Sequence, residues 1–389
     1  MALRRIAATV VGVALAVAAV GCSSDGGSDG TTSTAGEGGP TTTTPSAAGD
    51  PAYAEAGPNP VGTRTIALDD GRRVVAWYPA AETALDQPTE VFDIASLLTP
   101  ELQAKIPADL RPQYEIGAHP GADPASGGPF PVVLFSHGYA GFPEQSADLV
   151  THLASWGFVV VAPDHVERSL SGLLGNAAKG VDPRTDEEVL GASLDAALAD
   201  DFLSGLIDAE QVAVAGHSAG AAAAYRMAAT DERVKAFISY SVHLGDDEDQ
   251  VPVPKVPGMV MLGDADQTIT ADENRAVYDG MDPPKYLLEI ADAGHLVFSD
   301  ICEIGKEEGG IVGLVHQVGL DIPDDLLSLA SDGCQDDALD PPLAFGAIDH
   351  FSVAFLRHAL GVDPDPVGLD QATADEFADV DLTFTADPG

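Results

Sequence analysis

Short apolar runs alternate with segments of helical period along residues 131–290, and this alternation restricts the chain to few folds. The runs are short and apolar at nearly every position, which is typical of strands covered on both faces. We expect strands at residues 131–136, 157–164, 211–216, 233–241, 258–263 and 285–290, and helices at 144–156, 186–205, 219–229 and 271–278. The predicted fold class is therefore α/β, with a mostly parallel central sheet and helices on both faces. Residues 62–80 are predicted to precede it as a hairpin.

The stretch Gly-His-Ser-Ala-Gly, residues 216–220, lies where a predicted strand meets the next helix. The pattern G-x-S-x-G alone carries little weight in a chain with 41 glycines, and residues 26–30 repeat it inside a Gly- and Ser-rich tract. Only Ser218 has a strand before it and a helix after it, as a nucleophile on a sharp turn requires. Gly216 and Gly220 suit such a turn, because a Cβ at either position would collide with a neighbouring strand or helix. Ser218 is therefore the candidate nucleophile.

A serine hydroxyl needs a base to accept its proton and an acid to orient that base. Of the ten histidines, His295 alone lies directly beyond a late strand with a glycine before it. Asp264 and Asp266 both follow the preceding strand, so the chain order is serine, acid, histidine. Asp266 is favoured because it lies further out and can reach across to His295, whereas Asp264 suits the turn itself. Asp292, on the histidine's own loop, is a weaker third candidate.

The oxyanion that forms during acyl transfer needs backbone N–H donors. One candidate is the N–H of Ala219, at the start of the helix after the serine. The other is the N–H of Tyr139, in the loop at residues 136–141 that follows the first long strand. We interpret His137 in the same loop as a structural residue rather than as an acid–base group.

The segments PFPVVLFSHGYAG, GHSAG, LGDADQ and GHLVFSD, at these spacings, resemble the α/β-hydrolase superfamily. They are most similar to the branch with platelet-activating-factor acetylhydrolase-like enzymes, dienelactone-hydrolase-like proteins and bacterial polyester hydrolases. The resemblance covers about residues 61–360. It implies a serine hydrolase with these roles: nucleophile Ser218, general base His295, orienting acid Asp266, and oxyanion amides of Tyr139 and Ala219.

Two departures from this branch narrow the expected activity. Dienelactone hydrolases use a cysteine nucleophile, where this chain has Ser218. Polyester hydrolases usually have methionine after the serine and tryptophan on the next strand, where this chain has Ala219 and ISYSVHLG. We expect hydrolysis of a carboxylic ester of short to medium acyl length, lipid-like esters included, through an acyl-enzyme. The alternatives are an acyltransferase, a cutinase-like polyester hydrolase and a binding lipoprotein without catalysis.

Residues 61–365 are predicted as one hydrolase domain, and residues 366–389 as an acidic tail. An insertion at 299–345 separates the candidate base from the last helix, and its position makes it a candidate cap. The insertion contains Cys302 and Cys334, which we expect to form a disulfide in an oxidising compartment. Two unpaired cysteines are the alternative.

Residues 1–21 have the proportions of a secretory signal peptide, with two arginines before a short apolar run. They end before Cys22, in a context that resembles the lipobox of bacterial lipoproteins, whose cysteine is lipidated after cleavage. An ordinary signal peptide with an incidental cysteine is the alternative. Residues 22–60 are rich in Ser, Thr, Gly and Pro and predict a flexible tether. The expected location is the outer face of the cytoplasmic membrane or the cell envelope, or outside the cell if no lipid is attached.

The formal net charge of −44 argues against nucleic acid and against direct adsorption to anionic lipid. The expected partners are a small-molecule or lipid-like ester and a membrane contacted only through the lipid anchor, and we expect a monomer. The sequence has no metal-ligand cluster or nucleotide-binding loop, so no cofactor or metal is expected. An acidic run at residues 246–249 lacks EF-hand spacing and is interpreted as a solvated loop.

Overall fold

A ten-stranded sheet forms the centre of the computed structural model, which describes residues 49–389 except 177–180, 246–249 and 320. Its strand order is β12-β11-β10-β9-β8-β6-β7-β2-β1-β5. The strands are β1 (Val61–Ala67), β2 (Arg73–Pro79), β5 (His119–Pro120), β6 (Phe130–Ser136), β7 (Val159–Pro163), β8 (Ile207–His217), β9 (Val234–Tyr240), β10 (Gly258–Gly263), β11 (Lys285–Ile290) and β12 (Leu382–Asp387). The strands from β7 to β11 are parallel, and β2 and β12 pair antiparallel with the two ends of this set. The predicted α/β class with a mostly parallel sheet is confirmed.

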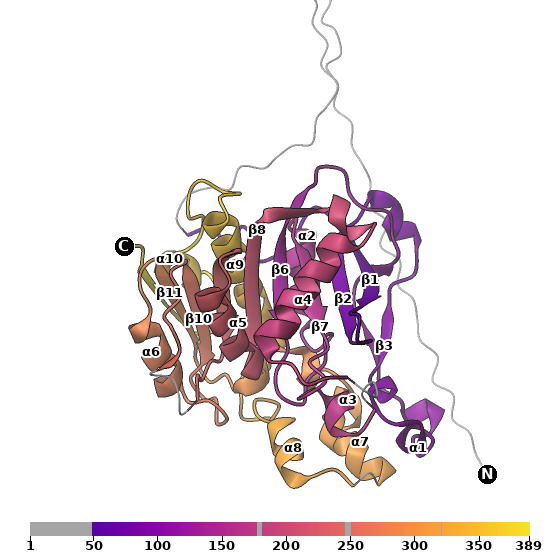
Figure 1. The fold of residues 1–389 in the computed structure, drawn as a ribbon. Helices are drawn as coiled ribbons and strands as arrows, with labels where there is room; N and C mark the ends of the chain where they lie inside the picture. The colour runs from indigo at the N-terminus through magenta and orange to yellow at the C-terminus, as the bar shows by residue number, and fades with distance from the viewer. Residues whose placement is uncertain (1–48, 177–180, 246–249, 320) are drawn as a thin grey trace, which may run out of the picture. The chain divides into compact units, whose positions relative to one another are not determined.

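Helices cover both faces of the sheet (Figure 1). The buried residues of α2 (Ala147–Ser155) and α9 (Pro342–Ala359) belong to the core on one face. Those of α4 (Asp186–Ala199), α5 (Ala219–Thr230) and α6 (Ala271–Gly280) belong to the core on the other face. The sheet is thus the middle of three layers, which is why its parallel strands are apolar on both sides.

Alternate residues of β6 face opposite layers. Val133 and Phe135 lie in the core that contains α2 and α9, whereas Val132 and Leu134 lie in the core that contains α4 and α5. All four side chains are fully buried. Each such burial stabilises the fold by about 1.5–3 kcal/mol relative to exposure.

The bounds of α4 follow from hydrogen bonds at its two ends. It begins in a capping box, in which the Thr185 side chain and the Glu188 side chain each accept a backbone N–H of the other residue. It ends at Ala199 rather than at the predicted residue 205, because Asp200 Oδ1 accepts two of the next three N–H groups and turns the chain. The aspartate therefore stops a helix that apolar periodicity alone would continue.

The remaining elements are short. They are α1 (Pro100–Gln103), α3 (Leu170–Leu173), α7 (Gly310–Val318), α8 (Asp324–Leu329), α10 (Gln371–Ala374), β3 (Val91–Asp93) and β4 (Gln113–Glu115). The helices α1, α3, α7 and α8 gather at one end of the sheet (Figure 1). Within the described residues, no helix combines the length and the apolarity that crossing a membrane would require.

The segment 366–389, predicted as an acidic tail, forms part of the sheet. Its strand β12 pairs antiparallel with the whole length of β11. Phe384 of β12 is buried and stacks on Phe351 of α9, with 4.9 Å between ring centroids. In β12, Phe384 is the one buried residue among partly or fully exposed neighbours, so the acidic composition of the segment does not reveal that it packs on the core.

The packed region also begins before residue 61. Tyr53 is buried, and its hydroxyl donates to Asp363 Oδ2 at 2.6 Å. The Tyr53 ring meets Trp156 edge-on, with 4.8 Å between ring centroids. The last part of the predicted tether is therefore held against α2 and α9, and residues 22–48 lie outside the described residues.

Replacing Phe384 tests whether the C-terminal strand contributes to stability. Phe384→Ala removes a buried aromatic ring, so we expect the free energy of unfolding to fall by about 3–5 kcal/mol. Thr385→Ala, at an exposed position of the same strand, is the control and should change it by less than about 0.5 kcal/mol. Urea unfolding followed by circular dichroism measures both. A loss as small for Phe384→Ala as for the control would contradict this role of β12.

Candidate active site

Ser218 lies on a sharp turn between β8 and α5. Its φ of 60° and ψ of −120° are strained for a residue with a side chain. Two close approaches force this turn: a Cβ at Gly216 would lie 2.2 Å from the Gly220 carbonyl oxygen, and a Cβ at Gly220 would lie 1.9 Å from that of Ser136. The Ser218 N–H donates to the Tyr240 carbonyl of β9 at 2.9 Å. The turn is therefore packed between β6 and β9, and the two glycines lie where a Cβ would collide, as predicted from the sequence.

His295 and Asp266 form a buried hydrogen-bonded pair. His295 Nδ1 donates to Asp266 Oδ2 at 2.8 Å, and the two residues are 1% and 5% exposed. Ser241 also donates to Asp266 Oδ2, and its Oγ lies 3.3 Å from His295 Nδ1. The N–H groups of Thr268 and Ile269 donate to the other carboxylate oxygen, each at 2.8 Å.

These contacts keep the Asp266 carboxylate ionised. Burial raises the pKa of Asp266, but the hydrogen bond and electrostatic attraction of the His295 ring and the hydrogen bond from Ser241 outweigh it, so the pKa lies below its ordinary value. An ionised carboxylate on Nδ1 orients the imidazole and stabilises its protonated form.

The other two candidate acids lie elsewhere. Asp264 is exposed, and its Oδ1 accepts the N–H of Asp292, on the loop that follows β11, at 2.7 Å, so it links two loops rather than bonding within its own turn. The side chain of Asp292 is also exposed. Of the three carboxylates considered from sequence, the structure brings Asp266 to His295.

His295 Nε2 is the free nitrogen of this pair. It is buried and has no hydrogen-bond partner among the described residues. Ser218 and His295 line the same cavity. A proton from a bound hydroxyl could therefore pass to Nε2 without displacing another contact.

The loop at residues 136–141, the oxyanion loop, is held by a buried arginine that the sequence did not single out. Arg168 donates to the carbonyl oxygens of His137 and Gly138, the second at 2.8 Å. Because a trans peptide places its C=O and N–H on opposite sides, the N–H of Tyr139 points away from Arg168. The N–H of Ala219, as the first residue of α5, has no partner within its helix. Arg168 thus fixes the peptide group of the Tyr139 N–H, and the Ala219 N–H is left without a partner in its own helix.

The cavity beside Ser218 has aliphatic walls. It holds about 1140 Å³ of empty space, part of it open to solvent. Besides the residues of the candidate site, its lining is Ile94, Ala95, Leu98, Ile106, Leu110, Pro112, Phe142, Leu170, Leu174, Leu296, Ile301, Ile311, Leu314, Val315, Ile322, Leu326, Leu327, Leu329 and Ala330. No Asp, Glu, Lys or Arg is among the described residues that line it. Nine of these 19 residues belong to the insertion at 299–345, which therefore forms one wall of the cavity, where a cap was predicted.

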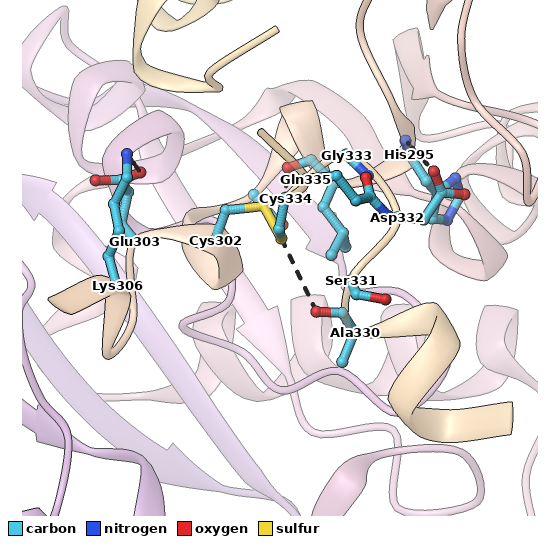
Figure 2. The surroundings of a disulfide bond; sticks show 12 residues. His295, Cys302, Glu303, Lys306, Ala330, Ser331, Asp332, Gly333, Cys334 and Gln335 are labelled. Atoms are coloured by element: carbon cyan, nitrogen blue, oxygen red, sulfur yellow. Dashed lines mark hydrogen bonds and ion pairs between the residues drawn. A yellow bond between two sulfur atoms is a disulfide. The ribbon is translucent and has the colours of Figure 1, made fainter. Parts of the chain in front are cut away.

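The predicted disulfide between Cys302 and Cys334 is present in this insertion (Figure 2). Next to Cys334, the Asp332 carboxylate accepts Thr268 Oγ1–H at 2.6 Å and the Gln267 N–H at 3.2 Å. The Asp332 carbonyl accepts the N–H of Leu296 at 3.0 Å. The insertion therefore contacts both the loop of Asp266 and the loop of His295, and the disulfide restricts the chain from which those contacts come.

Arg168, Ser241, Asp332 and Gln145 are residues of the site that sequence reasoning missed. Ser241 follows β9 at the carboxyl edge of the sheet, and that position was the one available signal. The other three form hydrogen bonds with loops that are distant in sequence, and these contacts exist only in the folded chain. Cys22 and the acidic run at 246–249 lie outside the described residues.

Comparisons with known proteins agree with this architecture. A family model described as Chlorophyllase matches residues 118–251, which include the oxyanion loop and Ser218. A Methylorubrum extorquens protein described as a carboxymethylenebutenolidase is 27% identical over 204 residues, which are 49% of this chain and 68% of that protein. The ferulic acid esterase from Streptomyces cinnamoneus superposes with a TM-score of 0.59 at 22% identity, over 85% of this chain and 97% of that chain. The last similarity establishes the fold alone.

Proposed function

We propose that this chain is an esterase of the α/β-hydrolase type, which hydrolyses neutral carboxylic esters through an acyl-enzyme on Ser218; its similarity to a Chlorophyllase family model and to a carboxymethylenebutenolidase supports this. One observation carries the proposal. The strained serine and a histidine with a free, buried Nε2 face one cavity, and an ionised aspartate holds the other nitrogen of that histidine. An unactivated serine would need neither the strain nor the pair.

In the proposed reaction, Ser218 Oγ attacks the ester carbonyl carbon while its proton passes to His295 Nε2. Asp266 stabilises the resulting imidazolium through the 2.8 Å bond to Nδ1. The amides of Tyr139 and Ala219 donate to the oxyanion. The C–O bond then breaks, and the alcohol leaves with the proton from His295. Water attacks the acyl-enzyme by the same route, and this step releases the acid and frees Ser218.

The cavity supports a substrate with an aliphatic acyl or alkyl part. Burial of each methylene against such walls contributes about 0.8 kcal/mol. A charged substituent would lie in the cavity without a counter-ion among its described lining, which is unfavourable. We therefore propose an uncharged aliphatic ester rather than the aromatic acid ester in the name of the structural relative.

We also propose that the protein acts outside the cytoplasm as a monomer. The support is sequence alone: residues 1–21 have the pattern of a signal peptide, and Cys22 follows in a lipobox-like context. In this proposal the membrane is contacted through the lipid anchor, and the acidic domain is held away from anionic headgroups.

Hydrolysis of 4-nitrophenyl esters from acetate to dodecanoate tests the activity and its preference. We expect kcat/KM to rise about fourfold per added methylene until the cavity is filled, which corresponds to about 0.8 kcal/mol each. Ser218→Ala should lower kcat by at least about 10⁴-fold. Ser193→Ala, a buried serine of α4, is the control and should keep kcat. Activity that survives Ser218→Ala would contradict the proposal, and a folded protein inactive on every ester would favour a binding function.

Replacing each aspartate of the same loop identifies the acid. Asp266→Asn removes the ionised acceptor of His295 Nδ1–H, so we expect kcat to fall by about 10³- to 10⁴-fold. Asp264→Asn is the matched control and should change kcat by less than about threefold, because Asp264 is exposed and the oxygen of the new amide can still accept the Asp292 N–H. Steady-state kinetics on the best ester of the series measures both. Equal effects of the two substitutions would remove Asp266 from the proposed triad.

A further inference from the structure

Gln145 lies just before α2, and its carboxamide is buried between two loops of the site. Its Oε1 accepts the N–H of Gly138 in the oxyanion loop at 3.1 Å. A Cβ at Gly141 would come within 2.0 Å of this oxygen, so a glycine there leaves the space that the carboxamide occupies. The backbone oxygen of Gln145 accepts the N–H of Asp300, which follows His295 in the chain, at 2.8 Å.

The other end of the carboxamide contacts His217, the residue before Ser218. Because Oε1 accepts a hydrogen bond, the opposite group is the NH₂, and it donates to His217 Nδ1 at 3.0 Å. An accepting Nδ1 leaves the ring proton on Nε2, which donates to the carbonyl oxygen of His295 at 2.9 Å. Burial and the neighbouring His295 lower the pKa of His217 to about 3, so the ring is neutral at pH 7. Each hydrogen bond from Gly138 through Gln145 and His217 to the His295 carbonyl therefore has one donor and one acceptor.

We propose that Gln145 and His217 are positioning residues. Their hydrogen bonds hold the oxyanion loop, the serine turn and the histidine loop at the fixed relative positions that catalysis requires. The inference rests on the ester hydrolysis proposed above. It assigns these residues no contact with the reacting atoms.

The three loops follow three different strands, β6, β8 and β11. Catalytic groups must be held within about 0.5 Å of their productive positions. Gly138 is next to the proposed donor Tyr139, and a Cβ at Gly138 would lie 3.4 Å from the Cβ of Ser218. A hydrogen bond to Gly138 N therefore sets the distance between the oxyanion loop and the serine. The bond from His217 to His295 sets the distance from the serine turn to the base.

Gln145→Leu keeps the side-chain volume and removes both carboxamide hydrogen bonds. We expect kcat on a 4-nitrophenyl ester to fall about 10- to 100-fold with KM changed less than about threefold, because most of the cavity wall comes from other segments. Gln371→Leu is the matched control. Gln371 also accepts an N–H, from Phe384, and donates to a carbonyl, that of Leu382, but it lies at the β12 edge of the sheet. The control should keep kcat.

Gln145→Glu tests the pH dependence of activity, which a purely structural role of Gln145 in packing would leave unchanged. Its carboxyl group still accepts from Gly138, but the hydrogen bonds at both sides of His217 are kept only when one extra proton is present, on the new carboxyl group or on the ring. Rising pH removes this proton, so either the carboxylate faces the Nδ1 lone pair or the ring loses its bond to the His295 carbonyl. Activity should therefore fall on the alkaline side, where the unchanged protein keeps it. Gln371→Glu should retain the unchanged profile. The titratable and charged groups around the pair, the same in all four variants, are His295, Asp266, His137, Arg168 and Asp300. Burial raises the pKa of Asp300 to about 8, so the shift is judged against the profile of the unchanged protein, which contains the same titration.

Unchanged kcat and an unshifted pH profile in both Gln145 variants would overturn the inference. Loss of the fold in both, judged by circular dichroism, would also overturn it, since the pair would then serve stability alone. Inactivity of the unchanged protein on every ester would instead refute the proposed function, so the two failures are distinguishable.

Discussion

The site depends on the close approach between the serine turn and β6. Gly220 lies so near the Ser136 carbonyl that no side chain fits, and Gly216 lies as near to Gly220. This packing holds Ser218 in a backbone region that costs about 1–3 kcal/mol. Such strain persists only where the surroundings are rigid, and here two buried helical layers enclose the strands on both sides. In return, the serine side chain is held at the edge of the sheet, facing the cavity.

Register within the sheet brings together groups that are far apart in sequence. His217 of β8 and Tyr240 of β9 are register partners, so the serine turn and the loop that begins at Ser241 leave the sheet next to each other. Gly263 of β10 and Ile290 of β11 are also register partners, so the loops of Asp266 and His295 leave the sheet side by side. Parallel pairing is the reason that the proposed acid, base and nucleophile meet at one edge without any local sequence signal for their contact.

Much of this arrangement is predictable from sequence, for reasons that differ from residue to residue. Apolar runs and chain order predict the sheet and place Ser218, Asp266 and His295 just beyond its strands. Arg168 and Gln145 were not predictable, because each acts through hydrogen bonds to a loop that approaches it only after folding. The C-terminal strand was missed for another reason: one buried phenylalanine decides its position, and the acidic residues around it dominate the composition.

The proposed catalysis requires that Ser218 is a nucleophile activated by His295, and covalent labelling tests this most directly. The purified protein would be treated with a medium-chain alkyl fluorophosphonate and examined by intact-mass measurement and peptide mapping. We predict one adduct per chain, located on Ser218, absent after Ser218→Ala and formed much more slowly after His295→Ala. No adduct on the folded protein, or an adduct on another residue, would contradict the account.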